Sequence, residues 1–227
     1  ALKGWKAPTA WTDSALKGKT EWQAAAAKVT ASTNAAYPSD AQVIGAVQRA
    51  MGSGVTLLHA AGGLPGELHK LWQAGAPGSY HAEYGFSTMG YEIAGGLGLK
   101  LTIVLLDNRG YGCINRLQMA TGGANFNNLL KDARHEVMPD VDFAAHAASL
   151  GAVAEKVASI AELETALAKA KGNDKTTVLV IDTDPLVSTE AGGHWWDVAV
   201  PEVSSRPQVN AARKAYDEKK LMRSLGD

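Results

Sequence analysis

The segment LTIVLLDNRGYG, residues 101–112, places polar side chains at the end of an apolar run. Its first six residues are apolar or β-branched, which predicts a strand that is buried on both faces. Open α/β sheets bind ligands outside the carboxyl ends of their strands, where Asn108 would lie. The Asn108 side-chain oxygen and the Gly110 carbonyl are hard oxygen ligands of the kind that Mg²⁺ accepts. Asn108 and Gly110 are therefore candidate metal ligands.

The same residues also have a plainer interpretation. An Asn followed by a glycine is common in a turn that simply closes a strand. Magnesium normally has at least one carboxylate ligand as well. Asp107 is a poor candidate for that ligand, because successive side chains of a strand point to opposite faces. The residues alone leave both interpretations of Asn108 open.

A second glycine-rich stretch, AAGGLPGELHKLW, has the features of an anion site. Gly62 and Gly63 follow an apolar run and allow the backbone to approach a ligand closely. The helix predicted to begin there directs free N–H groups toward such a ligand, and Pro65 suits its first turn. An ordinary strand–turn–helix connection is the alternative, and this stretch taken alone favours it.

A third stretch, EYGFSTMGYEIAGGLG, contains five glycines. Each glycine inside a helix costs about 1 kcal/mol, so we expect close packing or a cofactor lying against this backbone. Met89 taken alone is more typical of a core residue than of a cofactor contact.

The six histidines have neither metal-ligand spacing nor the spacing of a nucleophile–base pair. His59 and His146 lie in apolar runs and are expected in the core. His81, near the end of a short predicted strand, is the histidine that we expect to face a ligand.

The elements that would position these stretches alternate between strands and helices. Strands are predicted at residues 55–61, 79–84, 101–108, 152–157 and 176–184, and helices at 41–51, 62–73, 87–98, 141–151 and 159–171. This alternation predicts an α/β fold with a doubly wound parallel sheet. We expect residues 1–38 to be a linker with one helix near residues 21–30. The segment YPSD ends this linker, because Ser39 or Asp40 can cap the helix that follows. Residues 39–227 would form the domain, which ends in a charged helical tail.

Composition excludes several classes of protein. The net charge of −1 gives no basic face for nucleic acid or for a membrane surface. There is no apolar run of 18 residues, so no membrane span is expected. Cys113 is the only cysteine, which excludes an internal disulfide framework and favours a reducing cytoplasm.

Taken together, the three glycine-containing stretches resemble the C-terminal, diphosphate-binding domain of thiamine-diphosphate (TPP) enzymes. The resemblance extends from about Ser39 to the end of the chain. It implies that a glycine turn and helix hold the diphosphate, that a TMG loop supports the cofactor, and that an Asn-x-Gly turn binds magnesium. The implied cofactor-binding residues are Gly62, Gly63, Leu64, Ser87, Met89, Gly90, Tyr111 and Gly112, with Asn108 and Gly110 as magnesium ligands.

Within that superfamily the stretches GLPGELHKLW and GGHWWDV are similar to ring-opening hydrolases of inositol catabolism. The resemblance implies TPP- and magnesium-dependent hydrolytic cleavage of a C–C bond in a cyclic dione, a small-molecule substrate. It also implies a homodimer or homotetramer, in which a second subunit contributes its pyrimidine-binding domain. Two alternatives remain: a TPP enzyme of the acetolactate synthase type, or a non-catalytic fragment that binds no cofactor.

The chain departs from the family pattern in two places. The family has a Gly-Asp-Gly strand–helix unit, whose Asp is the magnesium carboxylate, where this chain passes directly from Gly98 to Leu99. We therefore expect a unit of roughly 30 residues to be missing there. The domain that carries the glutamate activating the cofactor is also not in this chain, so the catalytic residues are unknown. We expect this chain alone to be inactive and to hold neither magnesium nor TPP tightly.

Overall fold

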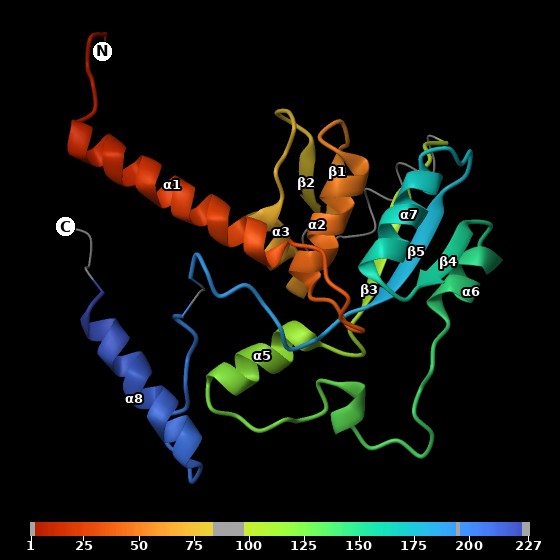
Figure 1. Cartoon of the computed structure of the whole chain (residues 1–227). Helices are drawn as coiled ribbons and strands as arrows, with labels where there is room; N and C mark the ends of the chain where they lie inside the picture. The colour runs from red at the N-terminus through yellow and green to blue at the C-terminus, as the bar shows by residue number, and fades with distance from the viewer. Residues whose placement is uncertain (1–2, 84–97, 194–195, 224–227) are drawn as a thin grey trace.

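The strands of the protein form parallel sheets flanked by helices, as the computed structural model in Figure 1 shows. The structure describes residues 3–83, 98–193 and 196–223. One sheet pairs β1 (Leu57–Ala60) with β2 (Tyr80–Glu83), and the other has the order β3 (Thr102–Asp107), β5 (Thr177–Asp182), β4 (Val153–Val157). All three strand pairings are parallel. The predicted α/β class and the five predicted strands are confirmed.

Where they are described, the helices follow the predicted alternation, with α5 as an addition. They are α1 (Thr9–Val29), α2 (Asp40–Met51), α3 (Gly63–Leu71), α5 (Gly112–Ala120), α6 (Phe143–Ser149), α7 (Ile160–Ala170) and α8 (Pro207–Leu221), with a short 3₁₀ turn, η1 (Leu130–Asp132). The predicted glycine-rich helix of residues 87–98 lies, apart from Gly98, outside the described residues.

Strand β5 is the centre of the larger sheet, with both faces covered. Leu179 and Ile181 are buried in a core with α7, while α6 packs against the same sheet. Val178, which points to the other face, is also buried. A strand covered on both faces needs apolar side chains at every position, which explains the unbroken run VLVI.

Helix α2 begins where the sequence predicts. The Ser39 hydroxyl accepts a hydrogen bond from the Gln42 N–H at 3.3 Å, and the Gln42 side chain accepts one from the Ser39 N–H at 2.9 Å. This reciprocal pair satisfies N–H groups that the first turn of a helix leaves without partners. Ser39 is therefore the residue that caps α2.

Helix α2 packs on two sides. One side joins α7 and β5 in the first core, and the other joins α1 and α3 in the second core. Its buried residues in the first core are Val43 and Ala46, and those in the second core are Ala41 and Ile44.

Three expectations about the local structure were wrong. The N-terminal helix spans Thr9–Val29 and not only residues 21–30, because the Ala- and Lys-rich segment before Glu21 favours helix. Helix α5 was not predicted, because Gly110 and Gly112 read as loop residues. His146 is exposed on α6, whose apolar run consists largely of alanines that do not require burial, whereas His59 is buried as expected.

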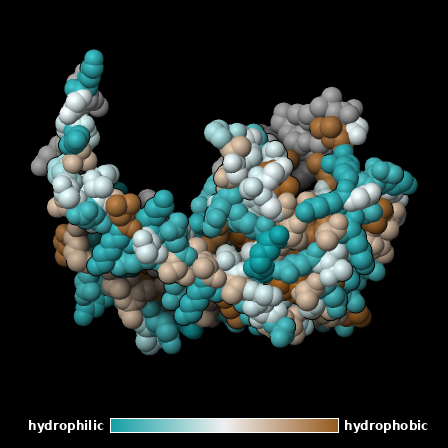
Figure 2. Space-filling view, turned by 45° about the horizontal axis from the view of Figure 1, so that its top comes forward, coloured by the Kyte–Doolittle hydropathy of each residue, from teal (hydrophilic) through white to brown (hydrophobic). Residues whose placement is uncertain are grey.

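Helices α1 and α8 extend from the body of the molecule (Figure 1). Only Ala26 of α1 is buried, while Trp22 packs against the second core and Trp11 is exposed. On the face shown in Figure 2, hydrophilic side chains predominate and hydrophobic ones lie between them in small groups. Within the part of the chain that the structure describes, no helix is both long and apolar enough to span a membrane.

Replacing Gly45 by Ala tests the close packing of α2. A Cβ at Gly45 would collide with the carbonyl oxygen of Thr30, which is backbone and cannot move aside easily. We expect Gly45→Ala to lower the free energy of unfolding by about 1–3 kcal/mol, the usual cost of overpacking. Gly18→Ala in α1 is the matched control, since nothing lies within 4 Å of its Cβ position. It should raise stability by up to ~1 kcal/mol. Chemical denaturation of both variants provides the measurement, and equal stability of Gly45→Ala and the wild type would contradict the packing described.

Candidate functional site

The carboxyl ends of β3 and β5 meet at one edge of the larger sheet. Asp107 and Asp182 are register partners at this edge. The residues that follow the two strands line a pocket of about 420 Å³. Its polar lining includes the carboxylates of Asp107, Asp182 and Asp184, the side chain of Asn108, and the cations Arg109 and Lys131. This is the edge at which α/β sheets bind ligands.

Asp107 and Asn108 have different roles at this edge. The buried Asp107 carboxylate accepts a hydrogen bond from the Arg109 N–H at 2.9 Å and forms an ion pair with the Arg109 Nε at 3.1 Å. Asn108 Oδ1 accepts the Gly110 N–H at 3.2 Å. The turn interpretation of Asn108 is therefore correct as far as the backbone is concerned. A carbonyl oxygen can accept a second interaction, so Asn108 Oδ1 retains capacity for a cation.

The first turn of α3 is open to an anion. Gly62 is its N-cap residue, with φ +138°, and no side chain caps the helix. Nothing lies within 4 Å of a Cβ position at Gly62, and a side chain there would be strained by the positive φ. The Leu64 side chain packs against the second core, so this residue could contribute only its backbone to a ligand. Uncapped N–H groups and the helix dipole make this turn suitable for a phosphate.

Helix α5 lies directly beside this turn. The position of a Cβ on Gly63 is 3.1 Å from Nη2 of Arg116 and 3.3 Å from Cβ of Cys113. A larger residue at 63 would push the two helices apart. The glycine therefore allows α3 and α5 to approach each other.

The same helix also contacts the metal-ligand candidates. A Cβ on Gly112 would lie 3.0 Å from Nδ2 of Asn108 and 2.9 Å from the Pro185 carbonyl oxygen. The Tyr111 N–H donates to the Asn128 carbonyl at 2.7 Å, and the Tyr111 side chain is 74% exposed. Helix α5 thus lies between the first turn of α3 and the Asn108–Gly110 turn, and brings the two predicted parts of the site together. The other three predicted contacts, Ser87, Met89 and Gly90, lie outside the described residues.

Two charged residues at this place were not predicted as site residues. Arg116 donates from Nη1 to the Pro185 carbonyl at 2.8 Å. Asp40, the first residue of α2, is only 6% exposed. Burial raises the pKa of the Asp40 carboxyl to about 6, an effect that Arg116 opposes and Glu67 reinforces. The sequence indicates only a helix-capping role for Asp40. Arg116 lies in α5, which was not predicted because the nearby glycines are typical of a loop.

A third unpredicted polar residue, Asn115, is 1% exposed. Its Oδ1 atom has no hydrogen-bond partner within the described part of the chain. A buried amide oxygen of this kind is costly unless something pairs with it. It lies in the same helix as Arg116, next to the candidate site.

Hydrogen bonds connect the loop of residues 189–193 to α3. The Glu67 carboxylate accepts hydrogen bonds from the N–H and the hydroxyl of Thr189. Lys70 Nζ donates to the carbonyls of Thr189 at 2.8 Å and Gly193 at 2.9 Å. These contacts anchor the start of the C-terminal segment on α3.

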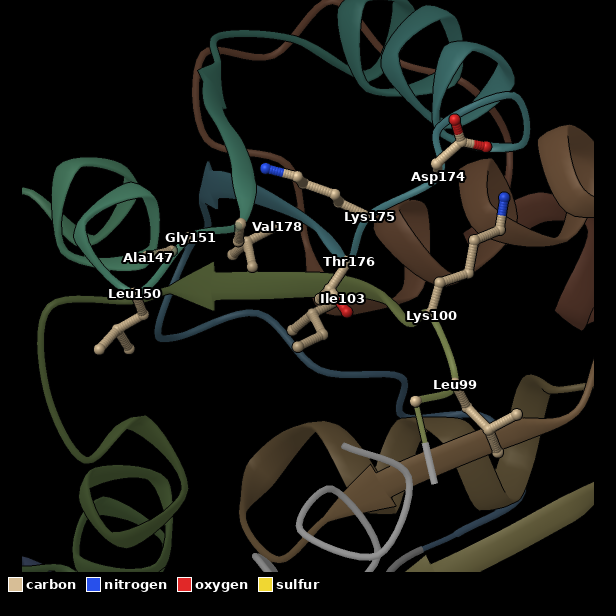
Figure 3. Close-up of a pocket in the computed structure, with 12 residues that line it drawn as sticks. Leu99, Lys100, Ile103, Ala147, Leu150, Gly151, Asp174, Lys175, Thr176 and Val178 are labelled. Atoms are coloured by element: carbon tan, nitrogen blue, oxygen red, sulfur yellow. The ribbon is translucent and has the colours of Figure 1, made fainter. Parts of the chain in front are cut away.

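Other places in the described structure are less suitable. A pocket of about 480 Å³ lies at the amino ends of β3 and β5, the opposite edge of the sheet (Figure 3). Lys100 at its rim donates to the carbonyls of Lys171 and Asn173 and so caps α7. His81, which we expected to face a ligand, is exposed and contacts the Gly78 carbonyl at 2.8 Å. Among the residues described, no three His, Cys, Asp or Glu are arranged to hold a metal ion.

Comparison with protein families identifies the domain. Residues 97–181 match the family described as thiamine pyrophosphate enzyme, C-terminal TPP binding domain. Residues 97–181 are part of a TPP-enzyme C-terminal domain. The match includes β3, the Asn108–Gly110 turn, α5 and β5, and it confirms the resemblance seen in the sequence motifs.

Curated relatives of this TPP-binding domain have one name in common. The chain is 36% identical over 197 residues to a 3D-(3,5/4)-trihydroxycyclohexane-1,2-dione hydrolase from Halalkalibacterium halodurans. This alignment covers 72% of the chain and 31% of the relative. A hydrolase of the same name from Bacillus licheniformis is 35% identical, over 70% of the chain and 30% of the relative. The chain therefore spans about a third of the length of these relatives.

Among solved structures, benzoylformate decarboxylase from Polynucleobacter necessarius is similar to the chain, with a TM-score of 0.51. The two are 15% identical, and the match covers 64% of this chain and 33% of the decarboxylase. At this identity the likeness supports the fold and says nothing about the reaction.

Asp40 should make the stability of the TPP-binding domain depend on pH. With a pKa of about 6 when folded and 3.8 when unfolded, the folded chain retains a proton that the unfolded chain has already lost between these values. Stability therefore decreases as the pH rises from about 4 to 6, and the loss persists at higher pH. Asp40→Asn should not show this loss. The difference in free energy of unfolding between Asp40→Asn and the wild type should therefore shift by about 1–3 kcal/mol in favour of the variant from pH 4.5 to pH 8. Denaturant melts of both proteins at the two pH values measure this difference.

Asp13→Asn in the exposed first turns of α1 is the matched control, and it should follow the wild type at both pH values. A constant difference between Asp40→Asn and the wild type across this pH range would show that Asp40 titrates like an ordinary exposed aspartate.

Proposed function

We propose that this domain binds the diphosphate of TPP at the first turn of α3, with magnesium held by Asn108 and Gly110. The observation that supports this most is the uncapped turn at Gly62, which α5 places beside the Asn108–Gly110 turn. The N–H groups of the α3 turn would bind the phosphate oxygens, and α5 would separate the diphosphate from the rest of the core. Bound TPP would supply the carbanion chemistry that cleaves a C–C bond.

We further propose that the whole protein is a TPP-dependent hydrolase that opens the ring of 3D-trihydroxycyclohexane-1,2-dione to 5-deoxy-glucuronate. The names of the curated relatives support this substrate, at 36% and 35% identity. The described residues themselves include no group that selects a cyclic dione. A cytoplasmic location is part of the same proposal, supported by the single cysteine.

The magnesium part of the proposal needs a ligand from elsewhere. Asn108 and Gly110 offer two neutral oxygens, and Asn108 Oδ1 already accepts the Gly110 N–H. The alignment with the Halalkalibacterium protein supports a missing unit. Since 72% of 227 residues is about 163, about 34 of the 197 aligned positions have no residue in this chain. A strand–helix unit after Gly98, with its carboxylate, would account for that difference.

We also propose that a second subunit covers α5 with its pyrimidine-binding domain, in a homodimer or homotetramer. Tyr111, Ile114 and Leu117 are exposed and follow each other at intervals of three, along one side of the helix. Apolar side chains arranged in this way are typical of a helix that packs against a partner.

The alternative that a specific observation favours is a fragment that binds no cofactor. The neutral metal-ligand pair and the turn formed by Asn108 would suit a purely structural role. Measuring TPP binding distinguishes a TPP-binding domain from a fragment that binds no cofactor, whereas loss of activity alone would not. An enzyme of the acetolactate synthase type would bind TPP equally and differ only in its substrate.

Cys113 provides a direct test of the TPP site. It is the only cysteine, it is partly buried, and its Cβ lies 3.3 Å from the Cβ position of Gly63. A diphosphate at the first turn of α3 should therefore slow its reaction with a maleimide several-fold. TPP with magnesium, up to millimolar concentration, should protect Cys113, whereas thiamine without the diphosphate should not. Cys113→Ser should abolish labelling altogether. Calorimetric binding of TPP without protection would place the cofactor elsewhere, and no binding would favour the fragment.

Asn108→Ala and Asp107→Ala should separate cofactor binding from stability. In the full-length protein, we expect Asn108→Ala to weaken magnesium-dependent TPP binding more than tenfold, or more than ~1.4 kcal/mol, because one of few protein oxygens on the metal is lost. Asp107→Ala should instead lower the free energy of unfolding by about 1–3 kcal/mol, because the Arg109 N–H loses its acceptor and the Arg109 side chain loses one of its two carboxylate partners. TPP titrations at fixed magnesium, with melts of both variants, measure the two effects. The reverse pattern would mean that Asp107 faces the metal.

A further inference from the structure

We propose that Arg116 is the positioning residue of the diphosphate site, and that the buried Asp40 competes with the diphosphate for its charge. This rests on the proposed function of the first turn of α3. Neither residue is among the site residues that the sequence predicts, and both come from elements outside the Asn108–Gly110 turn.

The contacts of Arg116 join two backbone segments that border the site. Its Nη1 donates to the Pro185 carbonyl at 2.8 Å, in the loop that follows β5. Its Nη2 lies 3.1 Å from the Cβ position of Gly63, in the first turn of α3. The guanidinium is thus bonded to one segment and lies directly against the other. We infer that Arg116 sets how closely the first turn of α3 approaches the Asn108 side of the site.

The charge of Arg116 is not neutralised by direct contact. Among the ion pairs of the described residues, which include those of Arg49, Arg109, Arg213 and Arg223, none involves Arg116. Its only recorded hydrogen bond in that part of the chain is to a neutral carbonyl. The guanidinium next to the α3 turn therefore remains available to a negative ligand.

Asp40 supplies the opposing charge from α2. The groups that act on its carboxyl come from three elements: Arg116 of α5, Glu67 of α3, and Thr183 and Asp184 after β5. Only Arg116 is a cation, while Glu67 and Asp184 repel the Asp40 charge. Glu67 is committed to Thr189. Arg116 is therefore the group that offsets the Asp40 charge.

A diphosphate bound at the α3 turn would add negative charge close to Arg116. Its repulsion of the Asp40 carboxylate, and its demand on the same guanidinium, would both favour the protonated Asp40. The carboxyl, which burial already holds at a pKa of about 6, would therefore take up a proton when the diphosphate binds. By linkage, lowering the pH toward 6 should strengthen diphosphate binding beyond what the ligand's own ionisation explains.

The first experiment replaces Arg116. TPP and inorganic pyrophosphate are titrated by calorimetry, with magnesium, into the full-length protein and into its Arg116→Met and Arg116→Lys variants. We expect at least a tenfold higher Kd for both ligands in Arg116→Met, and a partial recovery in Arg116→Lys, which retains the charge without the two-sided contact. Arg49→Lys is the matched control. Arg49 also donates to a backbone carbonyl, that of Thr30, but it lies between α2 and α7. Its Kd values should equal those of the wild type.

The second experiment compares the pH dependence of pyrophosphate binding in the wild type and in Asp40→Asn between pH 6 and 8. The ionisation of the ligand is common to both proteins and cancels in the ratio of their Kd values. We expect the wild type to lose at least threefold more affinity than Asp40→Asn as the pH rises. A merely structural role for Asp40 would change Kd by the same factor at every pH.

The outcomes distinguish the two proposals. Wild-type binding of TPP and pyrophosphate, with unchanged Kd in Arg116→Met and parallel pH profiles, overturns this inference and leaves the proposed function standing. Failure of the wild type to bind either ligand overturns both. Melts accompany each titration. If Arg116→Met does not fold, Arg116→Lys is compared with Arg49→Lys instead. Only Arg116→Lys should then raise the Kd of TPP and pyrophosphate.

Discussion

Helix α2 is buried between two hydrophobic cores, and the positions of the surrounding elements depend on that double packing. Toward one side, Val43 and Ala46 meet α7 and the central strand β5. Toward the other side, Ala41 and Ile44 meet α1 and α3. A helix that is apolar on two faces has no stable place at a surface, so it can lie only where two layers close over it. The small residues Ala41, Gly45 and Ala46 let those layers come close enough to do so.

The same helix brings the two halves of the candidate site together. Helix α3, with the open turn at Gly62, packs on one side of α2, whereas β5 packs on the other. The amino end of α2 lies between them, which is why a carboxylate at its first residue, Asp40, senses charges from α3, α5 and the loop after β5. Short-range packing of small apolar side chains thus decides the electrostatics of a site to which they contribute no polar atom.

The sequence predicted the strands well and the charged part of the site poorly. The β5 run and the Ser39 capping box have strong local signals, because burial and hydrogen bonding within a few residues determine them. The turn glycines at 62, 63 and 110 could likewise be predicted, because tight turns at strand ends favour glycine. Arg116 and Asp40 are 76 positions apart in the chain, and only the tertiary structure brings their charges within reach of each other. Helix α5 itself was missed because glycines at 110 and 112, which permit close contacts, have the same appearance as loop glycines.

The described strands form two sheets, and no described strand pairs across them. Among the described residues, helices and side chains therefore connect the α3 half of the site with the β3–β5 half. Such a junction can open by small sliding movements that break no strand ladder, and its rigidity is set by whatever spans it. A ligand held from both halves would act as a cross-link between two semi-independent folding units. Occupied and empty forms of this protein should then differ less in shape than in how cooperatively the two units unfold.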